Sequence, residues 1–197
     1  MKRVPLGIVD APHFIGSWRI EPTDLCNDII RLFEDNPAKH ASGKTYGGLD
    51  RDSKHSTDMM VLPRDLESEE FAALRTYIDR LYDCFADYLE QWPFLRTLGG
   101  FKIGPFNVQR YEPGGHFQQV HTERSSLGNA HRVLAWMTYL NDVPLGGGTY
   151  FSHFDLEIRP EIGKTLIWPA EWTHAHRGNT VTEGVKYIVT GWMHFPA

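Results

Sequence analysis

Hydrophobic and polar positions divide the chain into a first part with helical spacing and a later part with strand-like spacing. Between residues 22 and 37 apolar side chains recur at helical spacing, with Thr23 in position for an N-cap and Pro37 as a stop signal. A longer stripe at spacings of three and four ends before Pro93. Its members are Phe71, Leu74, Ile78, Leu81, Tyr82, Phe85, Tyr88, Leu89 and Trp92. We predict a short surface helix and a long helix whose aromatic stripe packs in the core.

Strand-like runs follow Gly99 and are separated by turn sequences such as Glu-Pro-Gly-Gly and Pro-Leu-Gly-Gly-Gly. The predicted strands cover residues 102–111, 133–140, 149–152, 155–158, 164–168 and 185–194. Residues 38–63 indicate a loop with one short strand at 59–62. Closely spaced strands without crossover helices favour an antiparallel sandwich or jelly roll over a parallel sheet.

Composition narrows the class of protein. The 197 residues fit one domain, and 41% hydrophobic, 13% aromatic and 23% charged residues are typical of a soluble globular protein. No segment approaches the roughly 18 apolar residues of a membrane helix, and the first residues lack the apolar core of a secretory signal. We therefore expect a cytoplasmic protein with no membrane partner. A net charge of −5 argues against a nucleic-acid partner, and Cys26 and Cys84 suit buried thiols.

Most of the chain's ten histidines lie in its second half, where His121-Thr122-Glu123 forms the first candidate site. Along an extended strand, residues i and i+2 point to the same face, so His121 and Glu123 can converge on one ion. Taken alone, this pair fits a solvated histidine and glutamate at a strand end better than a metal site.

A second pair at the same spacing, His174 and His176, offers a further imidazole ligand. Two histidines and one carboxylate form a facial triad that leaves open positions on non-heme iron. Periodicity does not separate His174 from His176 as the third ligand. The remaining later histidines suit surface or structural roles: His116, His131, His153 and His194.

Five ordered segments resemble the prolyl 4-hydroxylase-like branch of the iron- and 2-oxoglutarate-dependent dioxygenases. The tail His-x-Gly-x-x-Val-x-x-Gly-x-Lys, from His176 to Lys186, is similar to that branch's distal motif. The other segments are a Tyr-x-x-Gly-Gly entry to the His-x-Asp motif, an Arg-to-Tyr-Leu-Asn strand, a Gly-Gly-x-Thr-x-Phe segment and a Pro-x-x-Gly strand ending in Trp-Pro. They lie at residues 111–121, 132–142, 147–151 and 160–169.

This resemblance implies an α+β, mainly β fold in which a double-stranded β-helix, or jelly-roll, core occupies residues 101–197 of a single domain. Residues 1–100 are then a mostly helical N-terminal elaboration that supports the core. The resemblance also implies that His121, Glu123 and His176 bind Fe(II), whereas His174 matches nothing in the motif. The chain departs from the branch at Glu123, where the usual residue is aspartate; glutamate is one methylene longer and still offers an oxygen to iron.

The resemblance assigns co-substrate roles as well. Lys186 would anchor the distal carboxylate of 2-oxoglutarate, and Tyr139 and Tyr111 would contact the same molecule. The alternatives are a surface strand lysine and two core tyrosines with satisfied hydroxyls. Thr190 and Trp192 share a strand face with Lys186 and are candidate pocket walls.

The implied function is hydroxylation of an unactivated C–H bond with O2 as the other co-substrate, most simply of a peptidyl proline or a similar amino-acid side chain, with release of succinate and CO2. Residues 43–57 and 124–130 are candidate lid loops. A nucleic-acid demethylase of the same superfamily is an alternative enzyme, and a jelly-roll binding module without a redox metal is an alternative of another class.

Overall fold

The computed structural model describes residues 12–45 and 47–195. Its strands and α-helices in chain order are β1 (Gly16–Arg19), α1 (Asp24–Glu34), β2 (His40–Ser42), β3 (Thr57–Val61), α2 (Ala72–Gln91), β4 (Lys102–Ile103), β5 (Phe106–Tyr111), β6 (Phe117–His121), β7 (Arg132–Tyr139), β8 (Leu145–Gly146), β9 (Thr149–Phe151), β10 (Leu156–Ile158), β11 (Lys164–Pro169), β12 (His176–Gly178), β13 (Val181–Glu183) and β14 (Lys186–His194). Short 3-10 helices are η1 (Pro37–Lys39), η2 (Pro63–Glu67), η3 (Glu69–Phe71), η4 (Pro93–Leu98), η5 (Leu127–Asn129) and η6 (Trp172–His174).

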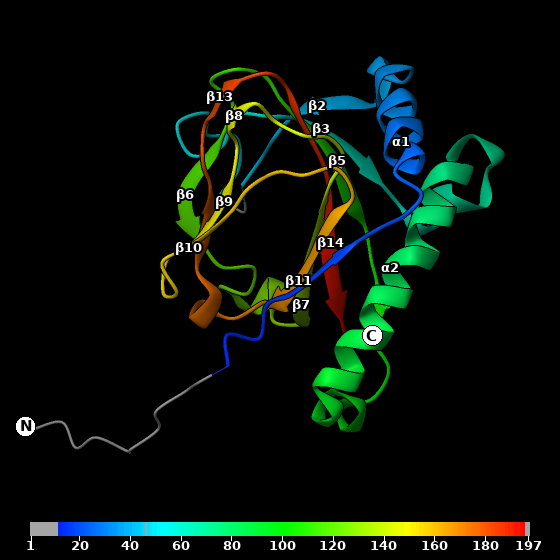
Figure 1. Ribbon diagram of the computed structural model, residues 1–197, viewed down its shortest axis with the longest axis vertical. Helices are drawn as coiled ribbons and strands as arrows, with labels where there is room; N and C mark the ends of the chain where they lie inside the picture. The colour runs from blue at the N-terminus through cyan, green and yellow to red at the C-terminus, as the bar shows by residue number, and fades with distance from the viewer. Residues whose placement is uncertain (1–11, 46, 196–197) are drawn as a thin grey trace, which may run out of the picture.

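Two antiparallel sheets face each other. The large sheet has the order β1-β11-β7-β14-β5-β3-β2, with β4 also paired to β14, and the small sheet has the order β10-β9-β12-β6. After residue 105 the chain alternates between them, with β5, β7, β11 and β14 in the large sheet and β6, β9 and β12 in the small one. This alternation confirms the predicted jelly roll, and Figure 1 shows the two sheets enclosing its interior.

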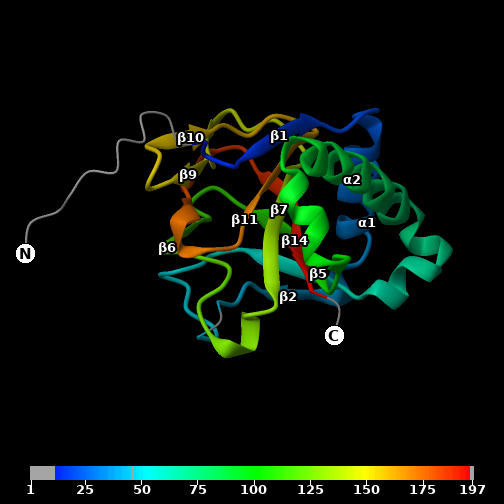
Figure 2. The ribbon, with the colours of Figure 1, turned by 90° about the horizontal axis from the view of Figure 1, so that it is seen from below.

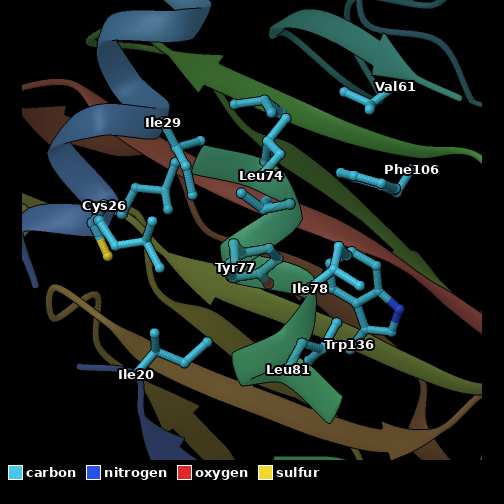
Figure 3. Close-up of a cluster of buried hydrophobic side chains, with 14 of the residues drawn as sticks. Ile20, Cys26, Ile29, Val61, Leu74, Tyr77, Ile78, Leu81, Phe106 and Trp136 are labelled. Carbon is cyan, nitrogen blue, oxygen red and sulfur yellow. The ribbon is translucent and has the colours of Figure 1, made fainter. Parts of the chain in front are cut away.

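Strand β7 shows how the sequence builds two core layers. Successive side chains point to opposite faces of a strand. Leu134 and Trp136 therefore pack in the cluster beneath the helices, whereas Ala135 and Met137 pack in the cluster between the sheets. Because both faces are buried, this strand has an almost unbroken apolar sequence. Figure 3 shows the cluster beneath the helices, where Tyr77 and Trp136 lie close together.

Helices α1 and α2 cover the outer face of the large sheet, on the side away from the small sheet (Figures 1 and 2). The two predicted helices are confirmed, and α2 ends at Gln91, before Pro93. Thr23 stands at the N-cap position of α1 but makes no side-chain capping hydrogen bond. The predicted burial was wrong for Tyr82, whose side chain is 39% exposed. The apolar stripe of α2 is wider than the face that the helix buries, so Tyr82 lies at its solvent-facing edge.

Several strands lie outside the sequence prediction. The run predicted at 102–111 is interrupted between β4 and β5 at Gly104 and Pro105, since proline has no N–H to donate to a ladder. Strand β2 lies in the segment predicted as loop and pairs with β3. Strands β1, β6, β8, β12 and β13 were also missed. The two cysteines are buried and unbonded, as predicted. Among the described residues, no helix combines the length and apolar character needed to cross a membrane.

Candidate metal and co-substrate site

A cavity of about 1100 Å³ opens between the two sheets. Its inner wall carries side chains of β14, β5, β7 and β11 that point into the jelly roll, and its opposite wall carries β6 and the start of β12. Residues from the first hundred also line it, from Lys39 on η1 to Met60 on β3. Ligand pockets commonly measure roughly 300–1,000 Å³, so this cavity has room for a co-substrate and part of a larger substrate.

The three predicted metal ligands meet at this cavity. His121 is the last residue of β6, His176 is the first of β12, and the two are paired across the sheet. Glu123 follows β6 by two residues, and its Oε1 lies 3.6 Å from His121 Nε2 and 3.3 Å from His176 Nε2. The candidate ligand atoms all lie within 4.8 Å of one another. Pairing of β6 with β12 therefore brings together residues that the sequence separates by more than fifty positions.

Hydrogen bonds at the far side of each ring determine which nitrogen faces the centre. His121 Nδ1 is 2.9 Å from the carbonyl oxygen of Gln119, and His176 Nδ1 is 2.8 Å from that of His174. A carbonyl only accepts, so each Nδ1 carries the hydrogen and each neutral ring presents a lone pair on Nε2. Two lone pairs facing a carboxylate repel it unless a cation lies between them. The donor set and its orientation fit a divalent metal such as Fe(II).

Aromatic rings hold the two imidazoles in place. Phe117 stacks on His121 with ring centroids 3.7 Å apart and an interplanar angle of 12°. Phe151 and Trp168 pack against His176 at centroid distances of 5.4 and 5.2 Å. These rings restrict the rotation of both ligands and keep water from their flanks.

Glu123 is tied down on its other oxygen. Oε2 accepts a hydrogen bond of 2.7 Å from Trp192 Nε1, and Arg132 Nη1 donates to the main-chain oxygen of Glu123 at 3.1 Å. Burial acts to raise the pKa of Glu123, but hydrogen bonds and charge from His121 and His176 in their protonated forms outweigh it and hold the pKa well below its usual range; a bound metal cation takes the place of those protons. The carboxylate is thus ionised and ready to bind a cation.

Lys186 begins β14 and is buried in the same cavity. Its Nζ donates to the carbonyl oxygen of Gly147 at 2.9 Å and lies 4.4 Å from the centroid of the Tyr111 ring. Across residues 12–45 and 47–195, no carboxylate lies within ion-pair distance of this ammonium. Burial lowers the pKa of Lys186 to about 7. A buried lysine without an acidic partner is suited to receive an anionic ligand.

The two predicted tyrosines have different surroundings. Tyr111 lines the cavity, and its hydroxyl donates to Gln109 Oε1 at 2.7 Å. Tyr139 does not line the cavity, and its hydroxyl lies 2.6 Å from Thr149 Oγ1 and 3.1 Å from the carbonyl oxygen of Ile158. Thr149 does line the cavity. Contact of either tyrosine with a co-substrate stays a prediction.

His174 is kept away from the ligand cluster by its own hydrogen bonds. Its Nε2 is 2.8 Å from the carbonyl oxygen of His13, and its Nδ1 is 3.0 Å from Thr173 Oγ1. Both ring nitrogens are therefore engaged. The predicted walls Thr190 and Trp192 line the cavity.

Both predicted lid segments reach the cavity. From residues 43–57 the lining side chains include Lys44, Asp50 and Lys54, and from residues 124–130 they include Ser125 and Asn129. Closure of either segment over the site stays a prediction.

Sequence reasoning missed a polar wall contributed by the first half of the chain. Lys54 is 4% exposed, and its Nζ lies 2.6 Å from Asp58 Oδ2 and 5.5 Å from the centroid of the Phe117 ring. Gln109 Nε2 donates to the same carboxylate oxygen at 3.1 Å. The segment carrying Lys54 reads as a polar loop, and its residues carry no local signal of burial.

Comparison with known proteins agrees with this geometry. A family model described as the 2OG-Fe(II) oxygenase superfamily matches residues 106–194. Human prolyl 4-hydroxylase subunit alpha-1 is 26% identical over an alignment of 96 residues, which covers 43% of this chain and 18% of the human protein. The chain thus spans only a small part of the length of that relative.

Solved structures share the fold at low sequence identity. A viral collagen prolyl hydroxylase from Paramecium Bursaria Chlorella virus-1, in complex with 2OG, aligns with a TM-score of 0.67 and 16% identity over 93% of this chain and 97% of the viral one. A Trichoplax adhaerens prolyl hydroxylase in complex with a hypoxia inducible factor peptide fragment aligns with a TM-score of 0.71 and 12% identity over 92% of this chain and 84% of that protein.

Proposed function

We propose that this protein is an Fe(II)- and 2-oxoglutarate-dependent dioxygenase that hydroxylates an unactivated C–H bond, and the match of residues 106–194 to the 2OG-Fe(II) oxygenase superfamily model supports the proposal. The proposed substrate is a peptidyl proline or a similar amino-acid side chain, and the proposed co-products are succinate and CO2. One observation carries the proposal: three convergent metal-ligand side chains and a buried lysine without a carboxylate partner share one cavity.

His121, Glu123 and His176 would hold the metal. They approach from one side, and an arrangement of two imidazoles and one carboxylate leaves coordination positions for small ligands. Bound iron, with 2-oxoglutarate and O2, would supply the oxidising chemistry, in which 2-oxoglutarate is decarboxylated and one oxygen atom enters the C–H bond. The protein's own contribution is to bind, orient and exclude water.

Lys186 would bind the end of 2-oxoglutarate that is remote from the metal. Its ammonium lies on the inner wall, next to Gly147 and Tyr111, where few water molecules compete for it. A charge-assisted hydrogen bond to a carboxylate is shorter and stronger in such surroundings than at a surface. The ammonium thereby sets the orientation of the co-substrate.

A peptide substrate suits the open end of the cavity. The cavity lining includes the uncharged polar side chains of Ser42, Asn107, Gln119 and Thr190. Relatives named prolyl 4-hydroxylase, and a neighbour bound to a peptide fragment, support the same class. Net charge of −5 argues against a nucleic-acid strand at this opening.

Co-product formation tests the reaction. Purified protein supplied with Fe(II), 2-oxoglutarate and air is expected to release succinate, and proline-containing peptides are expected to gain the mass of one oxygen atom by mass spectrometry. His176→Ala should abolish both signals. A wild-type protein that binds neither Fe(II) nor 2-oxoglutarate would contradict the proposal and favour a binding module.

A further inference from the structure

The carboxylate of Glu123 can meet a metal ion through one oxygen or through both. Its extra methylene gives the carboxylate more conformers, and both of its oxygens could face one metal ion. In this structure they are used differently, because Oε1 faces the two imidazoles and Oε2 accepts the 2.7 Å hydrogen bond from Trp192 Nε1. The carboxylate is 14% exposed, so water competes little for Oε2.

Trp192 is itself held in orientation. The guanidinium carbon of Arg132 lies 3.5 Å from the centroid of the Trp192 ring, and the same guanidinium donates to the main-chain oxygen of Glu123. Its Nη1 is also 3.8 Å from Glu123 Oε2. One arginine therefore contacts the indole plane, the backbone of the ligand and its carboxylate.

The two partners come from opposite walls of the jelly roll. Glu123 follows β6 of the small sheet, whereas Trp192 lies on β14 of the large sheet, 69 positions later in the chain. Arg132 is the first residue of β7, which pairs directly with β14. The position of the carboxylate thus depends on the spacing between the sheets.

We propose that Trp192 is a positioning residue that commits Glu123 to binding the metal through Oε1 alone, with Arg132 holding the indole in place. The proposal rests on the proposed function, since it concerns the same metal site. A glutamate that bound through both oxygens would occupy a coordination position that 2-oxoglutarate or O2 requires. Hydrogen bonds to the outer oxygen of a ligand commonly change metal affinity by about 10- to 100-fold.

Trp192→Phe tests the indole N–H, because phenylalanine keeps an aromatic ring beneath Arg132. Metal-free protein would be titrated with Co(II) under anaerobic conditions and followed by the visible absorption of bound cobalt. We expect about 10-fold to 100-fold weaker binding and a change in band intensity, because a second carboxylate oxygen raises the coordination number. Urea denaturation checks that the variant is folded.

Trp92→Phe is the control for Co(II) affinity. Trp92 follows helix α2 and does not line the cavity, and in the described part of the chain its buried Nε1 has no hydrogen-bond partner. Removal of that N–H should leave Co(II) affinity within about 3-fold of wild type, since no hydrogen bond is lost.

A double-mutant cycle with Glu123→Asp distinguishes positioning from a general effect on the fold. The shorter carboxylate should not reach the imidazoles and Trp192 together. In the Glu123→Asp background, Trp192→Phe should therefore weaken Co(II) binding by less than about 3-fold. An equal loss in both backgrounds, or equal Co(II) affinity and spectrum in wild type and Trp192→Phe, would overturn the positioning role and leave the proposed function intact. Absence of Co(II) binding by the wild type would overturn both.

Discussion

His174 and His176 lie two positions apart, yet only one has a ring nitrogen free for a metal. Both nitrogens of His174 are engaged by the His13 carbonyl and Thr173, whereas His176 uses only Nδ1. Periodicity left this choice open, because residues i and i+2 face the same side of a strand. The difference arises from the 3-10 turn η6, which includes His174 and ends before β12 begins at His176.

Substitutions at these two histidines should therefore separate stability from metal binding. His176→Ala is expected to abolish the visible band formed with Fe(II) and 2-oxoglutarate while the fold persists. His174→Ala should retain the band but lower the free energy of unfolding by about 0.5–1.5 kcal/mol, because the partly buried hydrogen bond to the His13 carbonyl is lost. Anaerobic absorption spectra and urea denaturation measure the two effects. Loss of the band in His174→Ala alone would reverse the ligand assignment.

The lowered pKa of Lys186 predicts that binding of 2-oxoglutarate depends on pH. Burial lowers its pKa to about 7, so at pH 8 most of the free protein carries a neutral amine there. A bound carboxylate stabilises the ammonium, so binding at pH 8 should take up close to one proton, and affinity should rise as pH falls towards 7 and then level off. Calorimetric titration of the metal-loaded protein in two buffers with different ionisation enthalpies measures the proton count.

Variants at Lys186 supply the controls for that experiment. Lys186→Met should bind 2-oxoglutarate about 10- to 100-fold more weakly, with no proton uptake. In the absence of ligand the same variant should be more stable than wild type at pH 7. The native pKa lies below the ordinary unfolded value of about 10.4, so the lysine destabilises the fold below pH 7, and this cost disappears as pH rises to 10. Proton uptake by Lys186→Met would place the titrating group elsewhere.

Residue identities predicted the ligand set well and its surroundings poorly. His121, Glu123 and His176 stand in recognisable spacings, and the structure brings them together. The bond from Trp192 to Glu123 spans 69 positions and depends on how the two sheets pack. Contacts of that kind have no local pattern, so only the cavity-facing side of Trp192 was predictable.

At the scale of elements, β14 is closely packed at Gly191. A Cβ added to Gly191 would meet Trp136 Cζ2 at 2.5 Å and Phe106 Cβ at 2.7 Å, in the core beneath the helices. Gly191→Ala is expected to lower the free energy of unfolding by about 1–3 kcal/mol, because the rings have no space to move away. Gly100→Ala is the control, since an added Cβ there meets nothing within 4 Å, and its effect should stay within about 0.5 kcal/mol. Urea unfolding midpoints compare the two variants, and equal midpoints would mean that the core around Trp136 relaxes.

Elements with strong periodicity or clear stop signals were predictable. Helix α2 has apolar residues at spacings of three and four and a proline just beyond its end. Strand β6, Phe-Gln-Gln-Val-His, has no regular alternation of apolar and polar residues. It forms a strand because it pairs with β12, and that contact has no signal in the local sequence. Strand β2 has only three residues at the edge of a sheet, too few for a period to appear.

At the scale of the molecule, the first half of the chain does more than support the jelly roll. Strands β1, β2 and β3 extend the large sheet at both ends; the segment between β2 and β3 brings Lys54 to the cavity wall, and β3 itself brings Asp58. The motifs that resemble prolyl 4-hydroxylases all follow residue 105. The family model likewise matches residues 106–194 and leaves out the cavity residues that come from the first half of the chain. The substrate opening is thus built from residues that carry no recognisable motif.

The order of strands in the large sheet bears on how this protein could be divided. Without residues 12–100, β11 and β5 would become free edges, and the apolar outer face around Trp136 would lose its helices. A fragment of residues 101–197 is expected to self-associate, which size-exclusion chromatography with light scattering would detect; a monomeric fragment that binds Co(II) would contradict this. The segment that carries the motifs is therefore not expected to work as a separate domain. A shortened or circularly permuted form of the protein would have to keep both helices and the strands β1, β2 and β3 at the edges of the large sheet.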